Sequence, residues 1–191
     1  MNHALARCAI IGGIVVFLWG TISWMVLPWH EMTMHKFKNE KRVAEVIQEN
    51  TDRSGVYVLP NIRCHEKGMS QKDKKEGMMR GKEMMQTGPV LFATVQKNGM
   101  KMDGALPFVL SLLIQIVAAF LITWLLLMTK VMPYMRQVGF VTTIALIAGI
   151  LIYVPDLIWG GTSLCFTIVS MLDLIIGWFL GGLVIAKLAR K

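Results

Sequence analysis

Cysteine and histidine are scarce in this sequence, which contains three cysteines and four histidines. An odd number of cysteines without a C-x-x-C pair does not make a disulfide framework. The residue spacings that bind structural zinc are missing. So are H-E-x-x-H, G-x-S-x-G, the P-loop, the Rossmann glycine pattern and the G-x-G-D of intramembrane proteases. The sequence therefore predicts a protein that is not an enzyme.

Charged residues are also few, at 17% of the chain, whereas 54% of the residues are hydrophobic and the mean hydropathy is +0.54. This composition is typical of a membrane protein and excludes an ordinary soluble domain. Four apolar runs are long enough to span a bilayer: residues 8–27, 106–128, 138–158 and 162–186. The sequence thus predicts an integral membrane, mainly α fold, with four transmembrane helices in a bundle.

The basic residues outside positions 28–104 indicate how the chain crosses the membrane. They lie in the N-terminal tail, in the loop after the second span and in the C-terminal tail: Arg7, Lys130, Arg136, Lys187, Arg190 and Lys191. Four crossings put these three segments on one side, which the positive-inside rule makes the cytoplasmic side. Residues 1–27 are then an uncleaved signal-anchor and first span, and residues 28–105 are extracytoplasmic.

The segment 28–105 is predicted to form a small extracytoplasmic α+β domain between the first two spans. Residues 30–48 have the periodicity of a surface helix, and residues 56–59 and 90–95 are typical of short antiparallel strands. Between the strands lies a Met- and Lys-rich insert, residues 61–88. A connection of this length is mobile, docked on a partner or folded as a short helix on the membrane.

The net charge of +8 does not indicate a nucleic-acid-binding protein. No nucleic-acid-binding motif is present, and the predicted topology places the basic residues of the domain outside the cytoplasm. Basic side chains near a bilayer are attracted to anionic lipid headgroups. Membrane lipid is therefore the predicted partner of the basic surface.

Two polar residues are expected at the middle of the membrane, Asp173 in the fourth span and Gln115 in the second. Counted from the outer ends of their spans, both lie about 15 Å deep. The structural interpretation is an Asp173–Gln115 hydrogen bond that determines which helices meet; the functional one is a proton or cation site. At the outer interface, His30 is similarly predicted to pair with Asp156, either as part of an aromatic belt or as part of a ligand or quinone-headgroup site.

Small residues in the spans predict close helix contacts. Gly177 and Gly181 form a G-x-x-x-G pattern followed by Gly182, and Gly13 and Gly20 lie on one face of the first span. Helices approach closely where side chains are this small. The fourth span is therefore predicted to be the packing centre of the bundle.

Soft donor atoms are frequent in the predicted extracytoplasmic domain and suggest a copper(I) site. The candidate ligands are His30, Met32, Met34, His35, Cys64 and His65. The alternative is that the methionines are flexible apolar filler, because methionine is frequent throughout the chain. A disulfide between Cys64 and Cys165 is a further possibility in an oxidising compartment.

Three stretches together resemble a family of uncharacterised small bacterial four-span inner-membrane proteins. They are W-G-T-I-S-W-M-V-L-P-W-H (19–30), G-V-Y-V-L-P (55–60) and D-L-I-I-G-W-F-L-G-G-L-V (173–184). The resemblance covers the chain apart from the Met- and Lys-rich insert. It implies a bacterial source and a four-helix bundle with an external domain, and it implies no activity.

The predicted function is that of an accessory, assembly or scaffold subunit in a larger bacterial inner-membrane complex, such as a respiratory one. The sequence has helix-packing devices but no recognisable reaction site or substrate pathway. Two alternatives remain: an extracytoplasmic copper-handling protein, and a small transporter or channel that uses Asp173.

Overall fold

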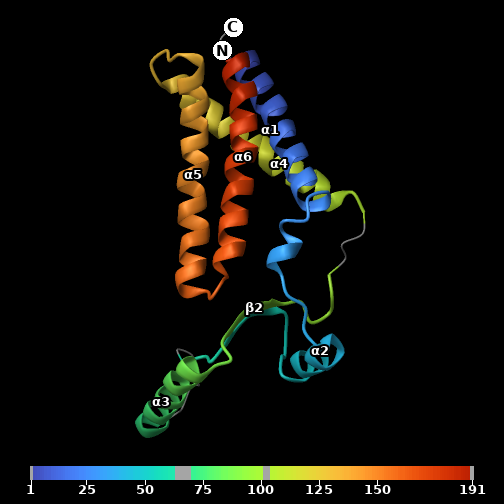
Figure 1. Cartoon of the computed structure of the whole chain (residues 1–191), viewed down its shortest axis with the longest axis vertical. Coiled ribbons are helices and arrows are strands. Elements are labelled where there is room, and N and C mark those ends of the chain that lie inside the picture. The colour runs from blue at the N-terminus through green and yellow to red at the C-terminus, as the bar shows by residue number, and fades with distance from the viewer. Residues whose placement is uncertain (1, 63–69, 101–103, 190–191) are drawn as a thin grey trace. The chain divides into compact units, whose positions relative to one another are not determined.

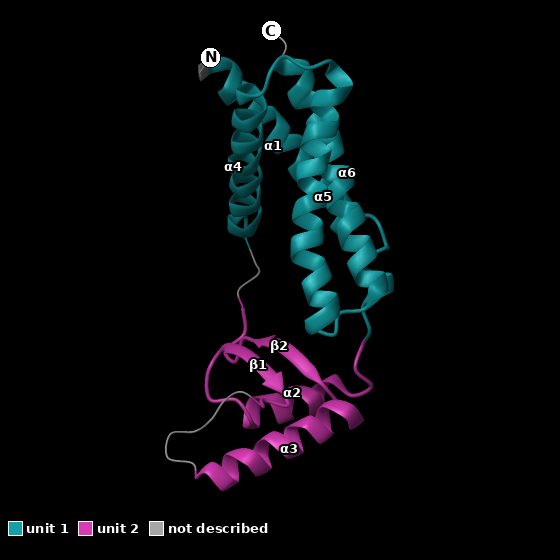
Figure 2. Cartoon of the chain, turned by 90° about the vertical axis from the view of Figure 1, so that its left-hand side faces the viewer, with its two compact units in different colours: residues 1–35, 102–191 teal, residues 36–101 magenta. Residues whose placement is uncertain are grey.

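The computed structural model describes residues 2–62, 70–100 and 104–189. The chain is mainly helical and divides into two compact units (Figure 2). The first unit comprises residues 1–35 and 102–191, and the second comprises residues 36–101.

Four long helices make up the first unit. They are α1 (Asn2–Met25), α4 (Leu106–Met128), α5 (Tyr134–Trp159) and α6 (Leu164–Leu188). Each is long and apolar enough to cross a membrane, since 23 residues at 1.5 Å per residue span about 34 Å. The predicted set of four long apolar helices is thus confirmed, although α1 and α5 begin several residues before their apolar runs.

Helices α1 and α6 together connect the four helices of this unit. Helix α6 packs against both α5 and α1, and α1 also packs against α4, whereas α4 and α5 barely touch. Figure 1 shows the four helices close together near the two chain termini, with α1 then diverging from α5 and α6. The first unit is therefore closed at the end that carries the termini and more open at the other.

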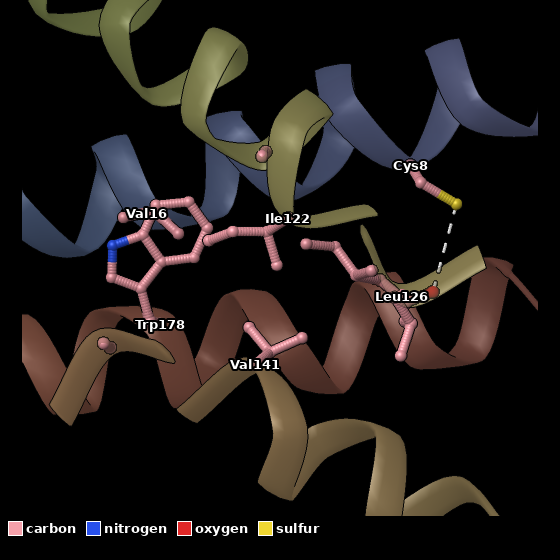
Figure 3. Packing of buried hydrophobic residues seen from close by; sticks show 9 residues of the cluster. Cys8, Val16, Ile122, Leu126, Val141 and Trp178 are labelled. Atoms are coloured by element: carbon pink, nitrogen blue, oxygen red, sulfur yellow. Dashed lines mark hydrogen bonds between the residues drawn. The ribbon is translucent and has the colours of Figure 1, made fainter. Parts of the chain in front are cut away.

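The apolar core fills the closed end of this unit (Figure 3). Each of the four helices contributes buried residues to it: Cys8, Val16, Ala119, Ile122, Leu126, Val141, Ala145, Trp178 and Ile185. The Cys8 thiol also donates a hydrogen bond to the Ile185 carbonyl, with a sulfur–oxygen distance of 3.9 Å. This core fixes the positions of α1, α4, α5 and α6 at the closed end.

Glycines allow the close approach of these helices. A Cβ atom on Gly13 would lie 2.7 Å from the Ile116 Cα atom, and one on Gly181 would lie 2.7 Å from Val16 Cγ2. A Cβ atom on Gly177 would lie 2.9 Å from Trp19 Cδ1, and one on Gly182 would lie 3.2 Å from Val141 Cβ. Gly20 differs, because no atom lies within 4 Å of the position that its Cβ would take.

The described residues of the second unit, 36–62 and 70–100, form a two-stranded sheet and two helices. Strands β1 (Gly55–Leu59) and β2 (Leu91–Val95) pair antiparallel, with Gly55 opposite Val95 and Leu59 opposite Leu91. Both strands were predicted within one residue of these bounds. The connection between them contains α3 (Gln71–Thr87), capped by the Ser70 hydroxyl, which accepts a hydrogen bond from the Asp73 N–H.

The helix expected over residues 30–48 is shorter than predicted. Helix α2 (Glu40–Glu49) begins after Asn39, whose side chain accepts a hydrogen bond from the Arg42 N–H as an N-cap. The preceding residues form a short 3₁₀ helix, η1 (Glu31–Thr33), and then an extended segment. Hydrophobic periodicity alone did not reveal this break, because the charged residues on both sides of Asn39 fit a solvated helix face.

Candidate functional site

The carboxylate of Asp173 on α6 contacts two residues from the N-terminal part of the chain. The indole Nε1 of Trp19 on α1 donates to Asp173 Oδ1 at 2.7 Å and to the Asp173 backbone oxygen at 3.0 Å. On the other carboxylate oxygen, Oδ2 lies 3.4 Å from Nε2 of His30. The Asp173 side chain is 14% exposed and the His30 side chain 2%. A charge in the middle of α6 is therefore held by neighbours from the same chain.

His30 reaches Asp173 because the chain turns back after α1. The helix ends at Met25, where the Leu27 N–H bonds back to the Ile22 carbonyl, and Pro28 cannot continue it. Within the turn, the Trp29 indole donates to Ser23 Oγ at 3.0 Å. These contacts return His30 to the helix layer instead of leaving it at the surface.

Aromatic rings enclose His30 in this position. The Trp24 ring is stacked on the imidazole, with centroids 3.8 Å apart and planes inclined by 12°. Trp29 meets the imidazole edge-on at 5.6 Å. The remaining nitrogen, Nδ1, is buried and has no hydrogen-bond partner among the described residues. The polar contacts of this ring are therefore concentrated on Nε2.

The roles of His30 Nε2 in these contacts depend on which ring nitrogen carries the hydrogen. Nε2 lies 3.4 Å from the carboxylate of Asp173 and 3.2 Å from Ser23 Oγ. Because an ionised carboxylate only accepts hydrogen bonds, the tautomer that carries hydrogen on Nε2 satisfies Asp173. Ser23 Oγ can accept hydrogen bonds both from His30 and from the Trp29 indole, since a hydroxyl oxygen has two lone pairs.

The pairing of polar residues differs from that expected from the sequence. Asp173 meets His30 and Trp19 instead of Gln115, and no hydrogen bond joins Gln115 to Asp173 in the described part of the chain. Asp156 is exposed near the end of α5, and His30 contacts Asp173 in its place. The physical reason is the turn at Pro28. It brings His30 back alongside the middle of α6, whereas its position in the sequence suggests a place beyond the end of the first span.

A partly open cavity of about 410 Å³ lies next to Asp173. All four long helices contribute to its wall. The lining residues are Val16, Phe17, Gly20, Thr21, Trp24, Pro107, Phe108, Ser111, Gln115, Tyr153, Asp173 and Leu174. An apolar cavity with a few converging polar groups is the usual form of a small-molecule site, so this cavity is the candidate functional site. Gln115 belongs to it as a wall residue.

The candidate copper ligands do not come together around His30. The His30 imidazole is occupied by Asp173 and Ser23, whereas Met32 and Met34 are 78% and 51% exposed. His35 is exposed as well. Cys64 and His65 lie outside the described residues, as does the Cys64 half of the suggested disulfide with Cys165. Across residues 2–62, 70–100 and 104–189, no three His, Cys, Asp or Glu side chains are placed to hold a metal ion.

Sequence reasoning missed Trp19 as a hydrogen-bond partner of Asp173 and Ser23 as a neighbour of His30. A usable signal was present, because residues 12, 16, 19 and 23 follow the spacing of one helix face. In the structure, Gly12, Val16 and Ser23 are buried and Trp19 is half-buried. A polar residue at the end of a buried face indicates a polar partner on a neighbouring helix.

No family model, curated protein or solved structure matches this chain. The function is therefore inferred from the geometry of the helices and of the cavity.

Proposed function

We propose that this chain is an accessory, assembly or scaffold subunit of a larger complex in the bacterial inner membrane, without catalytic activity of its own. In this proposal both termini are cytoplasmic, the four long helices form a transmembrane bundle, and residues 28–105 are extracytoplasmic. A respiratory complex is one assembly of this kind.

The main support is that Asp173, the carboxylate in the middle of α6, bonds within the chain. The Asp173 carboxylate has Trp19 and His30 as partners, and a paired carboxylate of this kind joins helices. The glycine face of α6 likewise packs on α1 of the same chain, at Val16 and Trp19. The bonds of Asp173 and the glycine contacts stabilise the fold. They leave the outer faces of the helices apolar.

The outer faces provide the surface for a partner. Only 22–33% of the most apolar window of each long helix is buried inside the chain. On α4, exposed large residues form much of the outer surface: Leu110, Leu113, Ile114, Val117, Leu121 and Trp124. In a membrane such faces contact either lipid or the helices of another protein, and lateral association is how an accessory subunit binds.

Purification from the native membrane tests this proposal. The full-length chain with a C-terminal affinity tag is isolated in a mild detergent, and the co-purifying proteins are identified and quantified by mass spectrometry. A larger membrane protein is expected in a fixed ratio to the chain. An unrelated four-span protein with the same tag serves as the control. A chain that elutes only as a monomer or homo-oligomer would contradict the accessory role.

A further inference from the structure

The cavity beside Asp173 has a charge pattern that selects its ligand. Among the described residues that line it, Asp173 is the one charged residue and none is a lysine or an arginine. We propose that this cavity binds the ammonium group of an amphiphile, such as the amine headgroup of a membrane phospholipid. This proposal does not depend on the accessory role and holds for the isolated chain as well.

The carboxylate of Asp173 retains the capacity to bind such a group. An ionised carboxylate has about four acceptor sites, whereas Trp19 and His30 provide one N–H group to each of its two oxygens. These two donors also hold the carboxylate in place, so little further ordering is needed when a ligand binds. An ammonium group has three N–H donors, and Gln115 and Ser111 in the same wall offer further oxygen acceptors.

The rest of the wall suits a cation attached to an apolar body. Four aromatic residues line the cavity: Phe17, Trp24, Phe108 and Tyr153. The faces of aromatic rings attract an ammonium group, by about 0.5–1 kcal/mol at exposed sites. The aliphatic residues Val16 and Leu174 provide contact for carbon atoms next to the amine. A small inorganic ion would leave this apolar surface without a partner.

The surroundings of the cavity favour a ligand that comes from the bilayer. The cavity is bounded by helices that are long and apolar enough to span a membrane. Its wall residues Phe108 and Ser111 on α4 are exposed, and so are their apolar neighbours Leu110 and Ile114. A lipid whose amine lies at Asp173 can therefore place its acyl chains along the exposed apolar residues of α4.

Lipid titration of the purified full-length chain tests the assignment. The delipidated protein in detergent is titrated with dioleoylphosphatidylethanolamine and, separately, with dioleoylphosphatidylglycerol, and bound lipid is counted by native mass spectrometry. The net charge of +8 favours the anionic lipid at non-specific sites. A preference of about tenfold for the amine lipid at one site per chain, equivalent to about 1.4 kcal/mol, is the expected result.

Two variants locate the site. Asp173→Asn removes the charge, and Asp156→Asn, at an exposed position outside the cavity wall, is its matched control. Gly20→Leu fills the cavity without changing Asp173, because Gly20 is a wall residue and its Cβ would meet no atom within 4 Å. Gly139→Leu is the matched control, since Gly139 is equally open but lies outside the wall. Loss of the preference in Asp173→Asn and Gly20→Leu, with both controls unaffected, is expected.

Three outcomes overturn the proposal. Equal binding of the two lipids does so, as does an unchanged preference in Gly20→Leu. Competition by free ethanolamine at concentrations equal to those of the lipid would show that the ligand is a soluble amine rather than an amphiphile. If Asp173→Asn does not fold, the comparison of Gly20→Leu with Gly139→Leu still decides the question.

Discussion

At the scale of single residues, Asp173 is the side chain whose burial in a helix bundle needs an energetic explanation. A charged side chain at the centre of a membrane-spanning helix costs about 2.5–3.5 kcal/mol on insertion scales. Trp19 Nε1 and His30 Nε2 approach its two oxygens at 2.7 and 3.4 Å, and hydrogen bonds to a charged group are the stronger ones. The carboxylate thus connects α6, α1 and the segment after α1, and its neighbours should be sensitive to substitution.

The Trp19→Phe variant removes the indole N–H from Asp173 while it keeps an aromatic ring. We expect it to lower the free energy of unfolding by about 0.6–2 kcal/mol, the range of interhelical hydrogen bonds in membranes. Unfolding by sodium dodecyl sulfate in mixed micelles, followed by circular dichroism, measures this loss. Trp24→Phe is the control, because Trp24 stacks on His30 through its ring and makes no hydrogen bond to the carboxylate in the part of the chain that the structure describes. Equal stability of the Trp19→Phe variant and the unmodified chain would show that the bond to Asp173 is not stabilising.

At the scale of whole helices, glycine positions determine how closely α1 can approach its neighbours. Gly13 allows contact with the backbone of α4 at Ile116, and Gly181 on α6 accommodates Val16 of α1. Gly20 lies on the same helix as Gly13 but adjoins the cavity. The two α1 glycines therefore have different roles, although in the sequence they belong to one small-residue stripe.

This difference gives a matched pair of substitutions. A Cβ atom at Gly13 would lie 2.7 Å from the Ile116 Cα atom, so Gly13→Ala must push α1 away from α4. Overpacking of this kind costs about 1–3 kcal/mol, whereas Gly20→Ala should change the free energy of unfolding by about 0.5 kcal/mol or less, as is usual for open positions. Thermal denaturation in detergent, monitored by circular dichroism, compares the two. A Gly13→Ala variant as stable as Gly20→Ala would rule out the close α1–α4 contact.

At the scale of the molecule, the sequence predicts helices and strands better than it predicts which side chains contact one another. The four long helices follow from apolar composition, and β1 and β2 follow from short runs of β-branched residues between turn residues. The site was only partly predictable, because the depth of His30 was counted along the chain without the turn at Pro28. The Asn39 cap was missed for a similar reason: one local side-chain bond outweighs a weak hydrophobic pattern.

The proposed topology is a property of the whole molecule, and cysteine labelling tests it. In a variant without Cys8, Cys64 and Cys165, a single cysteine is placed at Asn98 in the second unit or at Val131 between α4 and α5, both exposed positions. A membrane-impermeant maleimide added to spheroplasts should label Asn98→Cys at once and Val131→Cys only after lysis, because the basic residues flanking the second and third spans favour the cytoplasm. The reverse order would invert the topology. It would place the N-terminal end of α1 and the C-terminal end of α6 outside the cytoplasm. Labelling of both positions before lysis would instead show that the chain does not cross the membrane four times, since an odd number of crossings must separate Asn98 from Val131.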